Sequence, residues 1–178
     1  MTCLESYPDP STLSTISSTF WGSFWTLSLT AVVRSAVYRY INYKLPTKIC
    51  MNRFLPDRFP TPLCQICGLY TENDNHMLFL CPPKTHFWKE LIFGFLWPTT
   101  TADDIIQAIR YMNFYSIRYT QNSELAAQEI VFQGMGQIWK AHWNTVFNEI
   151  PFNPILFLSS TRASLNSLID EKHLHKYL

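Results

Sequence analysis

The sequence predicts a mainly α-helical protein. Apolar residues recur at helical spacing in three long stretches, residues 20–43, 82–97 and 124–149. Prolines separate these stretches, and no convincing set of segments shows the alternation of apolar and polar residues that marks strands. The chain has 178 residues, of which 47% are hydrophobic and 16% aromatic, enough for one packed domain with a small additional module.

The N-terminal part is predicted to be a tail followed by two helices. Residues 1–18 are rich in Ser, Thr and Pro, and their few apolar side chains cannot offset the entropy lost on ordering, so we expect a disordered tail. Residues 20–43 contain no proline and predict one continuous helix. Leu45-Pro46-Thr47 ends this helix, because a residue that precedes proline avoids helical geometry. A short helix is predicted over residues 48–54, and a proline-rich loop follows it.

Three thiols and one imidazole follow this loop within eighteen residues, in the order Cys64, Cys67, His76 and Cys81. The spacing is C-x2-C-x8-H-x4-C, and Gly68 follows the second cysteine, where the backbone must turn tightly. This CCHC donor set is that of a structural zinc site with four protein ligands and no open position for water. We therefore expect one structural Zn²⁺ in a knuckle between helices, without catalytic chemistry.

His76 and Cys81 are five residues apart, which on an uninterrupted α-helix rotates the two side chains by about 140° relative to each other. They can face one ion if a helical turn ends at Cys81 and a new helix begins at Pro82-Pro83, since proline is tolerated in a first turn. Cys81 then lies at a helix N-terminus, where the dipole favours the thiolate. His86 is the alternative ligand, but it lies one turn into the new helix.

The other cysteines, Cys3 and Cys50, do not suggest a disulfide framework. No signal peptide is visible, and the longest apolar stretch, residues 20–33, is too short and too polar to span a bilayer. We therefore expect an intracellular protein, nuclear or cytoplasmic, that is neither secreted nor bound to a membrane.

Further helices are predicted in the C-terminal part. The helix that starts at Pro82 ends before Pro98, and another covers residues 101–113 with Asp103-Asp104 in its first turn. The longest helix covers residues 124–149. A last helix is predicted around residues 165–169, with fraying beyond Glu171.

These motifs resemble a known family, the zinc-binding domain that follows the polymerase in the reverse transcriptases of non-LTR retrotransposons. The resemblance covers residues 20 to 98 and divides the chain into a tail (1–18), a zinc-binding domain (19–98) and a C-terminal helical region (99–178). The matching pieces are an aromatic-rich helix (Trp21 to Tyr43), Leu45-Pro46-Thr47, Cys64-Gln65-Ile66-Cys67-Gly68, Glu72, His76-Met77-Leu78-Phe79, Cys81-Pro82 and Trp88.

The resemblance implies that Cys64, Cys67, His76 and Cys81 bind the metal. It also implies packing positions at Leu45, Phe79 and Trp88. The polymerase itself is absent, so the chain is expected to be a detached part of such an element or a host protein built from one. Residues 99–178 match no family that we can name.

The resemblance further implies binding of RNA or single-stranded DNA. An overall charge of +1 gives no global attraction to nucleic acid, so binding requires a local patch. Asp57 is the only acid in a stretch that carries six cations, with Tyr38, Tyr40, Tyr43 and Phe54 interleaved, a combination suited to phosphates and unpaired bases. The alternative is an ordinary solvated helix face. The six cations are Arg34, Arg39, Lys44, Lys48, Arg53 and Arg58.

The second functional hypothesis is a zinc-stabilised module of a host protein that binds another protein, such as a polymerase, through its C-terminal helices. Its motivation is a surplus of aromatic residues at Trp139, Trp143, Phe147 and Phe152, which either form an interface or pack in the core.

An enzyme is not expected. The sequence has no phosphate-binding loop, no supported Ser-His-Asp arrangement and no open metal site. Asp103-Asp104 lacks the strand hairpin and the upstream carboxylate of a polymerase site, so it indicates a helix start.

Overall fold

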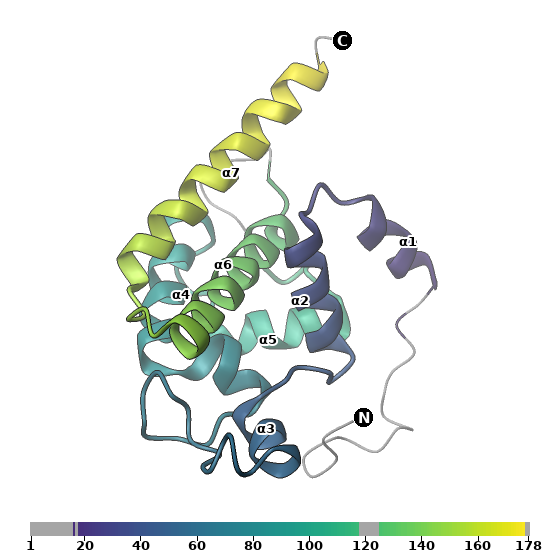
Figure 1. Cartoon of the computed structure of the whole chain (residues 1–178). Helices are drawn as coiled ribbons and strands as arrows, with labels where there is room; N and C mark the ends of the chain where they lie inside the picture. Colours follow the sequence, from purple (N-terminus) through teal and green to yellow (C-terminus); the bar gives the residue numbers. More distant parts are fainter. Residues whose placement is uncertain (1–15, 17, 118–124, 177–178) are drawn as a thin grey trace.

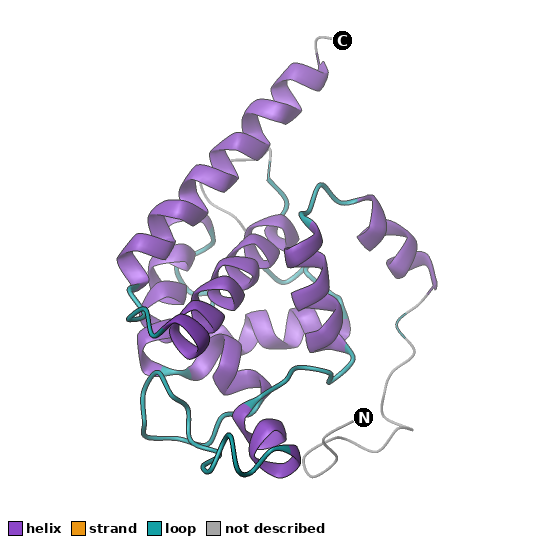
Figure 2. Cartoon of the chain, in the orientation of Figure 1, coloured by secondary structure: helices purple, strands orange, loops and turns teal. Residues whose placement is uncertain are grey.

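The computed structural model describes residues 16, 18–117 and 125–176. The predicted tail lies almost entirely outside these residues. Within them, Figure 2 shows helices joined by loops and no strand, as the sequence predicts. The helices are α1 (Ser18–Thr26), α2 (Ala31–Ile41), α3 (Lys48–Phe54), the π-helix η2 (His76–Leu80), α4 (Pro82–Phe95), α5 (Ala102–Tyr111), α6 (Ala127–Asn148) and α7 (Pro154–Lys176).

Helix α6 lies at the centre of the fold, with α2 on one side and α4 and α7 on the other (Figure 1). The π-helix contacts α4, α5 and α6, so the segment that carries His76 is packed into the helical body. Buried side chains between Phe24 and Leu168 form one hydrophobic cluster. Both predicted helical parts of the chain, residues 19–98 and residues 99–178, contribute to it.

Two glycines of α6 allow its neighbours to approach closely. A Cβ atom at Gly134 would lie 2.7 Å from Leu91 and 3.0 Å from the Trp88 ring, both on α4. A Cβ atom at Gly136 would overlap Val33 on α2. These two positions therefore need glycine because of space, not because of backbone conformation.

The prediction of one continuous helix over residues 20–43 is wrong, because a turn separates α1 from α2. The Arg34 guanidinium donates hydrogen bonds of 2.6–3.3 Å to four backbone carbonyls between Phe24 and Leu29. These bonds hold the chain in the turn that follows α1, where the carbonyls of Phe24 and Leu27 also accept backbone N–H groups. Thr30 caps α2 by accepting a hydrogen bond from a backbone N–H group of its first turn.

Other elements follow the sequence signals. The short helix over residues 48–54 is confirmed as α3, and α4 begins at Pro82. The predicted helix start after Thr101 is also confirmed, as α5. The Thr101 hydroxyl accepts a hydrogen bond from the backbone N–H of Asp104, and the Asp104 carboxylate accepts one from the backbone N–H of Thr101.

The last helix is much longer than the predicted segment of residues 165–169. It begins at Pro154 and is anchored by the buried side chains of Leu158, Thr161, Leu165 and Leu168, which recur every three or four residues. One of these positions is a threonine, which weakens the apolar pattern in the sequence.

Candidate metal centre

The structure brings the four predicted ligands together. Their donor atoms all lie within 4.8 Å of one another, with 3.9 Å between the Sγ atoms of Cys64 and Cys81 and 3.4 Å between Cys67 Sγ and His76 Nε2. Zinc bonds of about 2.3 Å to sulfur and 2.0–2.1 Å to nitrogen give tetrahedral edges of about 3.8 and 3.6 Å. The cluster therefore has the size and chemistry of a four-coordinate zinc site.

The two N-terminal thiols lie on a tight turn. Gly68 has a φ of 66°, a left-handed conformation that glycine adopts without strain, and its N–H donates to the carbonyl of Cys64 at 2.7 Å. An antiparallel bridge between Leu63 and Thr71 closes the loop that contains this turn. The role predicted for the glycine after C-x2-C is confirmed.

The π-helix aligns the other two ligands. A π-helix pairs residues five apart in the chain, whereas an α-helix pairs residues four apart. The wider turn from His76 therefore brings Cys81 back towards the same ion, although five residues of α-helix would point it away. Asn73 supports this geometry, since its Oδ1 accepts the His76 backbone N–H at 2.8 Å. The predicted turn that ends at Cys81 is confirmed, but its π form was not foreseen.

The two buried thiols, Cys64 and Cys81, are joined by a hydrogen bond that either sulfur can donate. Their hydrogen bond lowers the pKa of Cys64 and raises that of Cys81. A metal ion binds thiolates, so its binding would displace the proton of this hydrogen bond. Cys81 also precedes the first residue of α4, where the helix dipole favours negative charge on the sulfur.

A buried cation lies beside the cluster. The Lys84 side chain has no exposed surface, and its Nζ atom donates to the carbonyl of Met77 at 2.5 Å and lies 3.0 Å from Nδ1 of His142. Burial lowers its pKa, while the Glu72 carboxylate and the thiols oppose that effect. A zinc ion with three thiolates and a neutral imidazole carries one net negative charge, which the Lys84 ammonium would balance.

Glu72 and His142 complete this buried network. Glu72 Oε1 lies 3.7 Å from His142 Nε2 and accepts the backbone N–H of Lys48 at 3.1 Å. Burial raises the pKa of Glu72 to about 8 and lowers that of His142 well below its usual value. The network joins four parts of the fold. Glu72 lies in the loop of residues 55–75 that carries Cys64 and Cys67, called the metal loop below, and Lys48, Lys84 and His142 lie on α3, α4 and α6.

Sequence reasoning anticipated this network only in part. Glu72 belongs to the motifs that carry the resemblance, and its side chain is fully buried, as is that of His142. Lys84 was not singled out. Its signal is its spacing, since Lys84, Phe87, Trp88 and Leu91 occupy one inward face of α4.

The packing positions implied by the resemblance are buried as expected. Leu45, Phe79 and Trp88 are each at most 2% exposed. The Phe79 and Trp88 rings stack with centroids 5.1 Å apart, and the Trp88 indole N–H donates to the carbonyl of Leu78 at 2.8 Å.

Four of the six predicted nucleic-acid contacts are exposed: Arg39, Lys44, Arg53 and Arg58. Three of them lie near aromatic rings, with centroid distances of 5.9 Å from Lys44 to Tyr38, 5.9 Å from Arg53 to Phe54 and 5.7 Å from Arg58 to Phe59.

The other two cations are engaged within the fold. Arg34 holds the turn after α1, and Lys48 is buried with its Nζ atom 2.9 Å from Gln65 Oε1. Tyr40, one of the interleaved aromatics, is also buried, and its hydroxyl donates to Asn75 at 2.8 Å. Burial raises the pKa of Tyr40, so the hydroxyl stays protonated.

Some residues considered from the sequence do not join the cluster. His86 is exposed, Cys50 is half-buried on α3, and neither belongs to the group of four donors. Cys3 lies outside the described residues. Asp103 and Asp104 are exposed in the first turn of α5, in accordance with a helix start.

The aromatic residues of α6 and of the connection that follows it divide between core and surface. Trp139, Trp143 and Phe152 pack against the hydrophobic core. Phe147 is 55% exposed, although its ring stacks on Trp143 with centroids 5.0 Å apart.

No described helix has the length and apolar character needed to cross a membrane. Comparison with protein-family models, with curated proteins and with solved structures gives no significant match to this chain. The metal site is therefore supported by the geometry of its four ligands in the structure. The relationship of residues 20–98 to the reverse transcriptase zinc-binding domain stays a prediction from their motifs.

Proposed function

We propose that this chain is a zinc-stabilised helical module that binds RNA or single-stranded DNA and has no catalytic role. The observation that carries the proposal is the cluster of Cys64, Cys67, His76 and Cys81, whose four donors suit a closed tetrahedral site. Such a site binds zinc strongly but offers the ion no position for water or substrate. The metal's contribution is then to fold stability.

The proposed zinc ion fastens a long segment that has little regular structure. Residues 55–75 contain no helix longer than a turn, and they contact the helical body through polar bonds to Tyr40, Lys48 and Arg110. With zinc bound, the balanced charges of the site and Lys84 hold this segment against α4 and α6. A rigid loop in turn fixes the positions of nearby cations such as Arg58.

Nucleic-acid binding is supported by the exposed cations. Arg39, Lys44, Arg53 and Arg58 occur within a stretch whose only acid is Asp57. Cations of this kind neutralise phosphates and release counterions, so the affinity should fall as salt rises. By resemblance, the module derives from the reverse transcriptase of a non-LTR retrotransposon and handles nucleic acid beside a polymerase.

The first test is metal content. Purified protein should contain one zinc per chain by elemental analysis, and Cys64→Ser and Cys81→Ser should each reduce this content. Cys50→Ser is the matched control, because Cys50 lies outside the cluster. Full zinc retention in both ligand variants would contradict the site.

The second test is binding of labelled single-stranded RNA and DNA by fluorescence anisotropy, with zinc-loaded protein at several salt concentrations. The double variant Arg39→Gln/Lys44→Gln should weaken binding and reduce its salt dependence by about one to two units of slope. The control is Lys89→Gln/Lys140→Gln, which removes two exposed cations from α4 and α6. Absence of binding by the wild type at low salt would refute the nucleic-acid function.

A second candidate function is protein binding, which is supported by exposed apolar side chains near the junction of α6 and α7. Four apolar residues where α6 ends and α7 begins are all at least half exposed: Phe147 on α6, Ile150 in the connection, and Ile155 and Leu156 on α7. Apolar side chains that gather on a surface are typical of interfaces. Association that is insensitive to salt and is lost in Ile155→Ser/Leu156→Ser would favour this function over nucleic-acid binding.

A further inference from the structure

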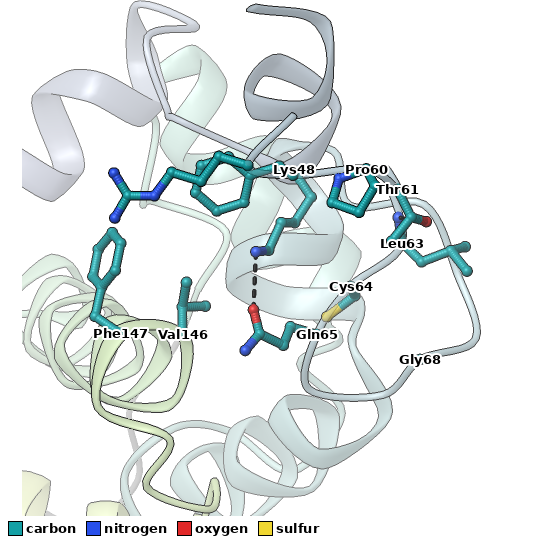
Figure 3. Close-up of a pocket in the computed structure, with 11 residues that line it drawn as sticks. Lys48, Pro60, Thr61, Leu63, Cys64, Gln65, Gly68, Val146 and Phe147 are labelled. Carbon is teal, nitrogen blue, oxygen red and sulfur yellow. Dashed lines mark hydrogen bonds between the residues drawn. The ribbon is translucent and has the colours of Figure 1, made fainter. Parts of the chain in front are cut away.

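A pocket of about 550 Å³ lies between the metal loop and the C-terminal end of α6 (Figure 3). Pro60, Thr61, Leu63 and Gly68 line it from the loop side, and α6 contributes Phe147 beside Val146. Pockets for small ligands are commonly about 300–1,000 Å³. The volume is therefore sufficient for a group of nucleotide size.

The pocket carries positive charge. Lys48 and Arg58 line it, and none of its lining residues is acidic. The Lys48 Nζ atom bonds to Gln65 Oε1 at 2.9 Å and is thereby held at the pocket wall (Figure 3). The nearby metal cluster adds one negative charge when zinc is bound, but the buried Lys84 balances it. The pocket is thus suited to an anion such as a phosphate group.

Two aromatic side chains also line the pocket. The Phe59 ring lies against both cations, 4.4 Å from Lys48 Nζ and 5.7 Å from the Arg58 guanidinium carbon. The Phe147 ring stacks on Trp143, which holds it in place while more than half of its side chain stays exposed. A ring held in this way is a platform on which a base can stack with little loss of entropy.

We propose that this pocket binds one unpaired nucleotide of a single strand, with the phosphate at Lys48 and Arg58 and the base against Phe147. The inference rests on the proposed nucleic-acid function and adds the place where a base is held. A bare anion would use the cations alone, whereas a nucleotide uses the cations and the ring together.

The first experiment tests the pocket with small probes. Adenosine monophosphate is added to zinc-loaded, isotope-labelled full chain, and the amide resonances of Gln65 and Gly68 and the methyl resonances of Val146 are followed by NMR. Adenosine monophosphate should shift these resonances and bind more tightly than inorganic phosphate. Equal affinity of the two probes, or no shift at these residues, would overturn the proposal.

The second experiment measures the affinity for single-stranded RNA. Phe147→Ala should weaken binding by about 5- to 150-fold, since stacking of one base on an aromatic side chain has this effect. Phe93→Ala is the matched control, because Phe93 is an exposed phenylalanine of α4 that does not line the pocket. Arg58→Gln provides a second variant at an exposed position, with Lys89→Gln as its control.

The two proposals fail in different ways. Strand binding that is unchanged in both Phe147→Ala and Arg58→Gln would overturn the pocket and leave the nucleic-acid function intact. Absence of strand binding by the wild type would refute the nucleic-acid function, and the titration with adenosine monophosphate would still decide whether the pocket takes a nucleotide.

Discussion

Replacement of the buried Lys84 by methionine should strongly destabilise the protein. Methionine has a similar length but cannot donate a hydrogen bond, so the carbonyl of Met77 and Nδ1 of His142 would both lose a buried partner. Each unsatisfied buried group costs about 1–3 kcal/mol. Removal of one member of a buried charged set costs about 3–5 kcal/mol in total. We expect a loss of this size in the free energy of unfolding of the zinc-loaded protein.

The zinc-loaded protein should lose more stability than the metal-free protein, because the ammonium of Lys84 balances the negative charge of a zinc ion bound to three thiolates. Urea unfolding followed by circular dichroism measures both states, and competition with a chelator measures the zinc affinity. Lys89→Met is the matched control, since Lys89 is exposed on the same helix and its replacement should change stability by less than about 0.5 kcal/mol. Equal stability and equal zinc affinity of Lys84→Met and the wild type would refute this reasoning.

Three further predictions concern the fold and its metal. Gly136→Ala should destabilise the protein by about 1–3 kcal/mol, because the added methyl group meets Val33. Gly94→Ala should stabilise it by about 0.5–1 kcal/mol, because alanine favours the helix and its Cβ atom would lie 3.6 Å from the flexible end of Arg162. Urea midpoints test both, and shifts in the same direction would count against the close helix contact. Thr101→Ala should cost about 1 kcal/mol through loss of the cap. The hydrogen bond from the Thr101 hydroxyl holds the pKa of Asp104 below its ordinary value of 3.8. The pair therefore contributes its full stabilisation of the folded state above pH 3.8, and this stabilisation is lost as the pH falls through the lower pKa of the folded state. Asp104→Asn should therefore reduce the loss in the free energy of unfolding at acidic pH. An equal loss in the variant and the wild type would argue against the cap. Removal of the metal with EDTA should lower the melting temperature, and restored zinc should raise it again; an unaffected melting temperature would exclude a structural role.

Local signals in the sequence were sufficient for several elements and for the ligands. The spacing of Cys64, Cys67 and Gly68 is a local pattern, and so is the cap at Thr101, because each depends on backbone turns a few residues long. The start of α4 at Pro82 follows from the restricted backbone of proline. For these features, the sequence determines the geometry without help from distant residues.

Other features depend on contacts that no local pattern records. The break after α1 depends on the side chain of Arg34, which takes up carbonyls that a continuous helix would have bonded. The burial of Lys48 and Glu72 depends on α3 and the metal loop meeting in space. A count of positive charges therefore overstated the exposed cationic surface by two residues, Arg34 and Lys48.

The single π-turn between His76 and Cys81 has a consequence for how the chain tolerates changes in length. Loss of one residue from this turn would rotate everything after it by about 100° relative to what precedes it. Trp88 would then swing away from Phe79, and α4 would present a polar side to its neighbours. Insertions and deletions at this point should therefore be far more damaging than substitutions, since the number of residues in the turn sets the orientation of an entire helix.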